Sequence, residues 1–116
     1  MEIVKKAWGR EVIFANNDKY CGKLLILDKA GSKGSMHFHM KKHETFYVQK
    51  GLFRIHMIDT ENAARHSYIR KEGETWVNEP GSPHQIEALE DNSILIEVST
   101  THYDSDSYRV MMGDGQ

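Results

Sequence analysis

The sequence predicts an all-β protein, folded as a sandwich or a barrel. Short runs of β-branched and aromatic residues recur along the chain, and clusters rich in Gly, Asn, Asp and Pro separate them. Several runs alternate between apolar and polar residues, as residues 52–58 do, which is typical of a sheet with two unlike faces. Only residues 60–66 have helical potential, and that stretch is too short to support the fold.

The expected strands are distributed regularly over a core barrel of residues 12–99. Turn clusters separate them at 16–18, 30–34, 50–51, 72–73, 78–83 and 90–92. Such spacing favours a sandwich or barrel over a mixed α/β fold. The polar residues 100–116 are expected to lie as an extended tail against the barrel or a partner. Strands are predicted at residues 12–14, 23–28, 35–40, 44–49, 52–59, 68–71, 74–77, 84–89 and 93–99.

Length and composition indicate one domain over residues 1–116. Cys21 is the one cysteine, so no internal disulfide forms and nothing indicates an oxidising compartment. The first thirty residues carry charges throughout and contain no apolar stretch of the signal-peptide kind. No apolar run approaches the roughly 18–20 residues that cross a bilayer. We therefore expect a cytoplasmic protein with no membrane partner.

Charge argues against nucleic-acid binding. The net charge is -2 and the pI is about 6.4, whereas nucleic-acid binders usually carry a basic face. Lys41-Lys42 and Arg70-Lys71 are isolated pairs, and each makes only a weak basic patch. The unusual feature is seven histidines, which are internal and dispersed.

Residues 31–51 follow the pattern G-x5-H-x-H-x4-E-x6-G. Residues two apart on a strand project to one face, so His37 and His39 can aim at one point. Glu44 can return on the next strand to meet them, and Gly51 permits the tight turn after it. Two imidazoles and a carboxylate suit one divalent ion: Zn, Fe, Mn, Ni or Co.

A second run, residues 73–84, ends in another histidine. Its Pro80-Gly81 corner presents His84 at the start of a new strand, which supplies a fourth ligand. A lone histidine on a strand is usually an ordinary polar or core residue. A random match to the first run alone has a probability of roughly 2 in 10,000 at this composition, so the metal interpretation is favoured.

These two runs resemble the two signature motifs of the cupin superfamily, over residues 31–84. The resemblance implies a double-stranded β-helix, the jelly-roll barrel, and a divalent metal held by the first motif's two histidines and glutamate and the second motif's histidine. Glu79 stands where the family usually has proline, and Ala88 where it often has asparagine. The implied metal ligands are His37, His39, Glu44 and His84.

Residues 6–9, the Tyr20/Lys23/Leu25 set and residues 95–98 look like the cupin domain of type II mannose-6-phosphate isomerases. That family usually has glutamine where His37 stands, and its tail is echoed faintly in residues 106–109. The resemblance implies a metal-dependent isomerase for a small sugar or sugar phosphate. A divalent ion stabilises the developing oxyanion in such a reaction, and a general base moves the proton.

Three charged residues are candidates for catalysis. Glu97 interrupts the apolar strand 94–98 and is the predicted general base, although an edge-strand glutamate facing solvent fits the pattern too. Lys23 interrupts a strand similarly, and Arg109 lies in the tail. Either can hold a negative oxygen or phosphate, or can be an ordinary surface charge.

Two other functions remain open. A non-haem metal dioxygenase uses the same donors, and oxygen consumption with ferrous iron would identify it. A non-catalytic cupin would bind carbohydrate without turnover. Five aromatic residues are suited to stacking on sugars or to core packing: Trp8, Phe38, Phe46, Tyr47 and Trp76.

The other histidines are expected to lie outside the metal site. His43 adjoins Glu44 and so points to the opposite face, as a surface or loop residue. The remaining three, His56, His66 and His102, have no ligand spacing and are expected to be ordinary surface or core residues. Edge strands need covering, and the segment 1–6 can pair with a neighbour, so we expect a homodimer.

Overall fold

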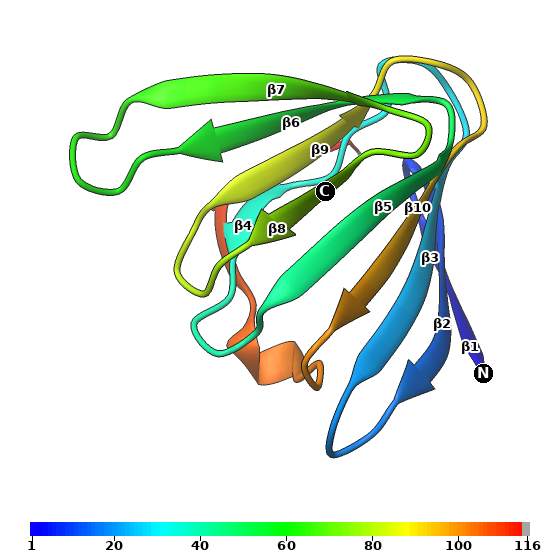
Figure 1. The fold of residues 1–116 in the computed structure, drawn as a ribbon, viewed down its shortest axis with the longest axis horizontal. Coiled ribbons are helices and arrows are strands. Elements are labelled where there is room, and N and C mark those ends of the chain that lie inside the picture. The colour runs from blue at the N-terminus through cyan, green and yellow to red at the C-terminus, as the bar shows by residue number, and fades with distance from the viewer. Residues whose placement is uncertain (115–116) are drawn as a thin grey trace.

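The computed structural model describes residues 1–114, which form two antiparallel sheets (Figure 1). One sheet has six strands in the order β1-β2-β3-β10-β5-β8, and the other has five in the order β11-β4-β9-β6-β7. This arrangement confirms the predicted all-β jelly-roll barrel. The strands are β1 (Glu2–Lys6), β2 (Gly9–Asn16), β3 (Cys21–Leu27), β4 (Met36–Phe38), β5 (Glu44–Lys50), β6 (Leu52–Ile58), β7 (Arg65–Lys71), β8 (Thr75–Asn78), β9 (His84–Ala88), β10 (Ser93–Ser99) and β11 (Tyr108–Met111).

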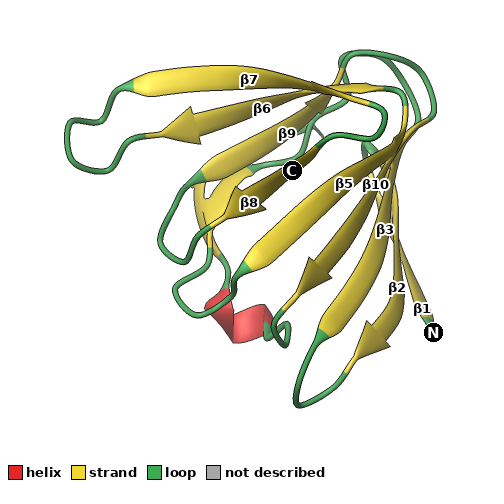
Figure 2. Cartoon of the chain, viewed as in Figure 1, coloured by secondary structure: helices red, strands yellow, loops and turns green. Residues whose placement is uncertain are grey.

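All nine predicted strands are present; the strand predicted at 93–99 has the same bounds as β10, and each of the others is shifted at one or both ends. The helical potential of residues 60–66 is not realised: Ala63 has a positive φ of 59° in a turn, and β7 already begins at Arg65. The described residues contain one helical turn, the 3-10 segment Asp104–Asp106 (Figure 2). None of their helices is long and apolar enough to span a bilayer.

Both ends of the chain contribute strands that the sequence did not predict as part of the barrel. The N-terminal strand β1 pairs with β2 of its own chain and forms one edge of the six-stranded sheet. The tail does lie against the barrel, and it does so as β11, which pairs with β4 and places Arg109 opposite His37. The tail therefore reaches the segment that carries the first two predicted metal ligands.

The inward-facing residues divide the barrel interior into an apolar part and a polar part. Along β3 the inward residues change from Leu27 and Leu25 to Lys23, and along β10 they change from Leu95 to Glu97. The apolar part holds a core in which a fully buried Val, Leu, Ile or Phe side chain contributes about 1.5–3 kcal/mol. That core contains Trp8, Leu25, Leu27, Phe46, Val48, Phe53, Ile55, Ala88 and Leu95.

The glycine that ends the first motif is required by its turn. Gly51 has φ +88°, and a Cβ at this position would lie 2.1 Å from the Ser93 hydroxyl oxygen. Both the left-handed backbone and the close approach exclude a larger residue without rearrangement. The turn connects β5 to β6 at the end of β5 that lies opposite Glu44.

Candidate metal centre

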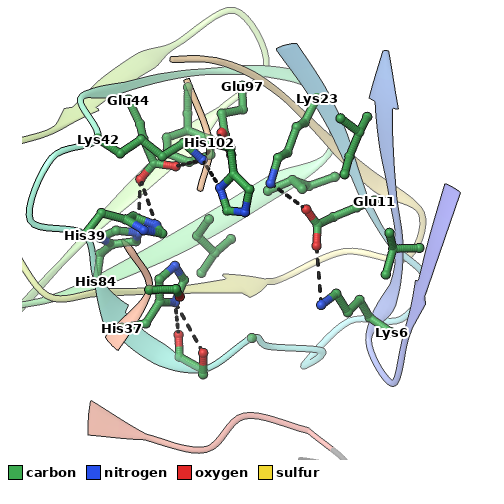
Figure 3. Close-up of a pocket in the computed structure, with 18 of the residues that line it drawn as sticks. Lys6, Glu11, Lys23, His37, His39, Lys42, Glu44, His84, Glu97 and His102 are labelled. Atoms are coloured by element: carbon green, nitrogen blue, oxygen red, sulfur yellow. Dashed lines mark hydrogen bonds and ion pairs between the residues drawn. The ribbon is translucent and has the colours of Figure 1, made fainter. Parts of the chain in front are cut away.

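Three histidines from two segments of the chain meet in the polar part of the interior (Figure 3). His37 on β4 lies directly opposite His84 on β9, and their ring centroids are 4.6 Å apart. His39 follows β4, with its ring centroid 5.1 Å from that of His37. One ring nitrogen from each of the three lies within 4.8 Å of the others, so the cluster can hold a metal ion.

The hydrogen bonds of these rings fix which nitrogen is free to bind. Nδ1 lies 3.0 Å from the Ser35 carbonyl oxygen in His37, 3.0 Å from that of Ser82 in His84, and 2.7 Å from that of Asp106 in His39. A carbonyl oxygen only accepts, so each Nδ1 carries the proton and donates it. Each Nε2 therefore keeps its lone pair for a metal, the usual arrangement for histidine ligands.

Glu44 completes a set of donors with an unsatisfied oxygen. Its Oε1 lies 3.4 Å from Nε2 of His84 and 3.8 Å from Nε2 of His39. This Oε1 is buried and has no hydrogen-bond partner among residues 1–114. A carboxylate oxygen and unprotonated nitrogens repel one another unless a cation lies between them. These residues therefore fit a borderline divalent ion, which takes imidazole and carboxylate donors.

Burial keeps two of these imidazoles neutral. It lowers the pKa of His37 to about 3 and that of His84 to about 4, from an ordinary value of 6.5. A histidine bound to metal must be unprotonated, so both side chains are prepared for binding at neutral pH.

Metal-free protein is expected to lose stability as the pH falls from about 6.5 to 4. In this window the unfolded chain takes up protons at both histidines, whereas the folded state does not. Their stabilising effect is therefore complete above pH 6.5 and decreases below it. Thermal melts of chelator-treated protein should show this fall, and His37→Gln should reduce its slope. A melting temperature independent of pH across this window would contradict the expectation.

The structure corrects the interpretation of Lys42 as part of a weak basic patch. This lysine does not belong to a surface basic patch: only 2% of the residue is exposed, and its ammonium points inward. Nζ lies 2.7 Å from Oε2 of Glu97, 3.3 Å from Oε2 of Glu44 and 3.2 Å from Nδ1 of His102. Burial by itself lowers the pKa of Lys42, but the two carboxylates outweigh it and raise the pKa above its ordinary value. Lys42 is thus a cation that links Glu44 to Glu97.

The structure places all three candidate catalytic residues on the cavity. Glu97 is 3% exposed and faces the interior, so the solvent-facing alternative is wrong. Lys23 is 5% exposed and donates a 2.9 Å hydrogen bond to Oε1 of Glu11. Oε2 of Glu11 lies 3.5 Å from Nζ of Lys6. Arg109 is largely exposed and lines the same cavity from β11.

The cavity between these groups has a volume of about 490 Å³. The histidines and Glu44 line one part of it, and Lys23, Glu11 and Lys6 line another (Figure 3). Of the aromatic residues proposed for stacking, Trp8 and Phe46 line it. The other three lie elsewhere: Trp76 stacks on Phe46, Phe38 stacks on Tyr108, and Tyr47 is exposed on β5.

Four residues of the site were not assigned from sequence. His102 was expected to be ordinary, but it lines the cavity and contacts Lys42. Asp106 accepts backbone hydrogen bonds from residues 40–42 and supplies the carbonyl that orients His39. The sequence could have indicated Lys42, because it stands two residues before Glu44 and residues two apart in an extended segment project to the same face. No pattern in the sequence around Glu11 predicted that it would pair with Lys23.

The other histidines lie away from the three-histidine cluster. His43 is an exposed loop residue whose Nε2 lies 3.5 Å from a carboxylate oxygen of Glu79. His56 pairs with Glu87, with Nε2 and Oε1 2.8 Å apart, and His66 is exposed on β7. These three fit the ordinary roles predicted for them.

Solved structures share this architecture. The chain is similar to the capsular polysaccharide assembling protein CapF from Staphylococcus aureus, with a TM-score of 0.83 and 22% identity over 96% of this chain. It spans only 34% of CapF. KdgF from a Halomonas species is similar with a TM-score of 0.69 and 22% identity, covering 83% of this chain and 82% of its own.

Oxalate decarboxylase from Bacillus subtilis is similar with a TM-score of 0.73 and 24% identity, over 87% of this chain and 27% of its own. These likenesses show the fold. No curated protein sequence matches the chain significantly. The family model for Cupin matches residues 23–110, which include every donor of the metal centre and most strands of both sheets. The chain belongs to the cupin family.

Proposed function

We propose that His37, His39, Glu44 and His84 hold one divalent metal ion, and that the protein is a metal-dependent isomerase of a small sugar or sugar phosphate. The observation that carries this proposal is a second buried carboxylate on the same cavity. Glu97 faces the cavity and is held in place by Lys42, which also contacts Glu44. Glu44 thus belongs to the proposed metal ligands, while the carboxylate of Glu97 is available for proton transfer.

The bound ion would polarise a carbonyl and the neighbouring hydroxyl of the substrate and stabilise the negative charge that develops there. Glu97 would accept a proton from one carbon and return it to the adjacent carbon. Nζ of Lys42 lies 2.7 Å from Oε2 of Glu97 and the Ser99 hydroxyl donates to the same oxygen, so the carboxylate is held in place. Trp8 and Phe46 would pack against the apolar face of a sugar ring.

Two comparisons support carbohydrate chemistry. The sequence resembles type II mannose-6-phosphate isomerases at residues 6–9 and 95–98, and Glu97 lies in the second segment. CapF, which shares the fold, is named as a capsular polysaccharide assembling protein. A polyhydroxylated substrate also suits a cavity whose walls present several charged side chains beside aromatic ones.

The proposal is tested by proton exchange. Metal-loaded protein is incubated in deuterated water with a panel of aldoses and their phosphates, and NMR records deuterium at carbon 2 and ketose formation. Exchange that requires the metal supports an isomerase. Oxygen consumption with ferrous iron in the absence of exchange would instead identify a dioxygenase. Sugar binding with neither reaction would identify a binding protein.

We also propose a homodimer, formed through the outer face of the six-stranded sheet. Ile3, Tyr47, Val77 and Val98 are 43–57% exposed on this face, and Phe14 lies over Gly22 beside them. Apolar residues that cross a whole sheet are typical of a covered surface. Light scattering is expected to give twice the monomer mass of 13.4 kDa. Val98→Lys should shift the protein toward monomer, whereas a monomeric wild type at micromolar concentration would refute the dimer.

A further inference from the structure

The cavity contains two buried lysines whose hydrogen-bonding capacities are used differently. An ammonium group has three N–H donors. Nζ of Lys42 has three acceptors within 3.3 Å: Glu97, Glu44 and His102. Nζ of Lys23 has one hydrogen bond among residues 1–114, the 2.9 Å contact with Glu11. The ammonium of Lys42 is thus surrounded by three partners, whereas that of Lys23 has one hydrogen-bond partner and two N–H groups left.

Those two donors belong to a side chain that is 5% exposed and lines the cavity. Lysine is almost never so buried unless it is paired, because an unpaired ammonium loses its hydration. Glu11 offsets the charge only in part, since its other oxygen lies 3.5 Å from Nζ of Lys6. One carboxylate therefore serves two ammonium groups, so these three side chains together carry a net positive charge.

Arg109 adds a further positive side chain to the cavity lining, from β11. Lys23, Glu11 and Lys6 form a row in Figure 3, across the cavity from the histidines. A ligand held at the histidine cluster by vicinal oxygens could therefore extend toward this row. The charged side chains of this row can accept an ionised group, and the two remaining N–H groups of Lys23 can donate hydrogen bonds to it.

We infer that Lys23 is the anion-binding residue of this cavity, and that the substrate carries an ionised phosphate or carboxylate which Lys23 contacts. This inference rests on the proposed function in one respect, that the cavity receives the substrate. Glu11 competes with the anion for the same ammonium and so limits the affinity. Lys42 is not assigned this role, because its ammonium already has Glu97, Glu44 and His102 as partners.

The experiment compares three probes on the metal-loaded full chain by isothermal titration calorimetry: glucose, glucose 6-phosphate and glucuronate. The ratio of anionic to neutral affinity removes the contribution of the metal, which all three probes share. Wild type should prefer at least one anionic probe, and the preferred probe distinguishes phosphate from carboxylate. Lys23→Met should lower that preference about ten- to hundredfold, the value of a charge-assisted hydrogen bond.

For Glu11→Gln we expect the opposite change in anionic preference. This variant therefore distinguishes a Lys23 that binds the anion from a Lys23 that only forms a structural ion pair with Glu11. It keeps an acceptor for Lys23 but removes the competing charge, so the anionic preference should rise. The double variant Lys23→Met with Glu11→Gln leaves no unpaired buried charge and serves if Lys23→Met fails to fold. Lys50→Met, an exposed lysine outside the cavity, is the matched control and should leave the ratio unchanged.

Two results would overturn the inference. If neither glucose 6-phosphate nor glucuronate binds wild type more tightly than glucose does, an anion site is excluded. An anionic preference that survives both Lys23→Met and the double variant would place the anion elsewhere. Absence of isomerisation would refute the proposed reaction but would leave these affinity ratios intact, so the two failures are distinguishable.

Discussion

His39→Ala is expected to remove most of the bound divalent metal, whereas wild-type protein should carry close to one ion per chain. His39 is 5% exposed, and its Nδ1 is fixed by the Asp106 carbonyl, so its Nε2 is held toward the other donors. Alanine removes one of the four proposed donors. Since loss of an outer partner alone weakens metal binding about 10–100-fold, loss of a donor should exceed that. Elemental analysis of the purified variants measures the effect.

The matched control is His43→Ala, four residues along the chain. His43 is exposed and its ring contacts Glu79 rather than the cluster, so this variant should keep its full metal content. A wild-type protein that binds no divalent ion under any loading condition would refute the metal centre. Full metal retention by His39→Ala would show that the ion is bound elsewhere.

Glu97→Gln is expected to reduce turnover about 10²–10⁴-fold while preserving metal content and sugar binding, because a general base contributes that much to rate. Glutamine fills the same volume and can still accept a hydrogen bond from Lys42. Lys42 keeps Glu44 as a charged partner, with Nζ and Oε2 3.3 Å apart, so the metal donors stay in place. The carbon 2 exchange rate reports the chemical step, and elemental analysis reports the metal.

Glu87→Gln is the control for this variant. Glu87 on β9 pairs with His56, is absent from the cavity lining and should be replaceable without loss of turnover. Equal exchange rates in wild type and Glu97→Gln would exclude Glu97 as the base. A parallel loss of metal in Glu97→Gln would show instead that Glu97 acts through the Lys42–Glu44 contact.

Local patterns in the sequence were sufficient for the strands and for the shared face of His37 and His39, whereas His84 was assigned from the second motif. Side chains alternate across a strand with a period of two, so the spacing of His37 and His39 could be interpreted before their strand pairing was known. The alternation in residues 52–58 likewise predicted β6, and Gly51 marked the turn before it. The boundaries were less accurate. β4 has three residues instead of six, because the chain turns after Phe38 to pack against Asp106.

Tertiary structure alone decided the contacts between distant segments. Asp106 orients His39 from 67 positions away, and His102 contacts Lys42 from 60 positions away. No periodicity within a segment encodes such distances, since they depend on where β11 pairs and how the tail returns. The burial of Lys42 has the same origin in part: a lysine in a polar turn is normally solvated, and Glu97 from β10 joins the nearby Glu44 in compensating its charge. Short-range spacing in the sequence thus predicted the strands and the shared face of His37 and His39, whereas the fold brought in the charged partners around them, because those contacts join segments that are neighbours only in space.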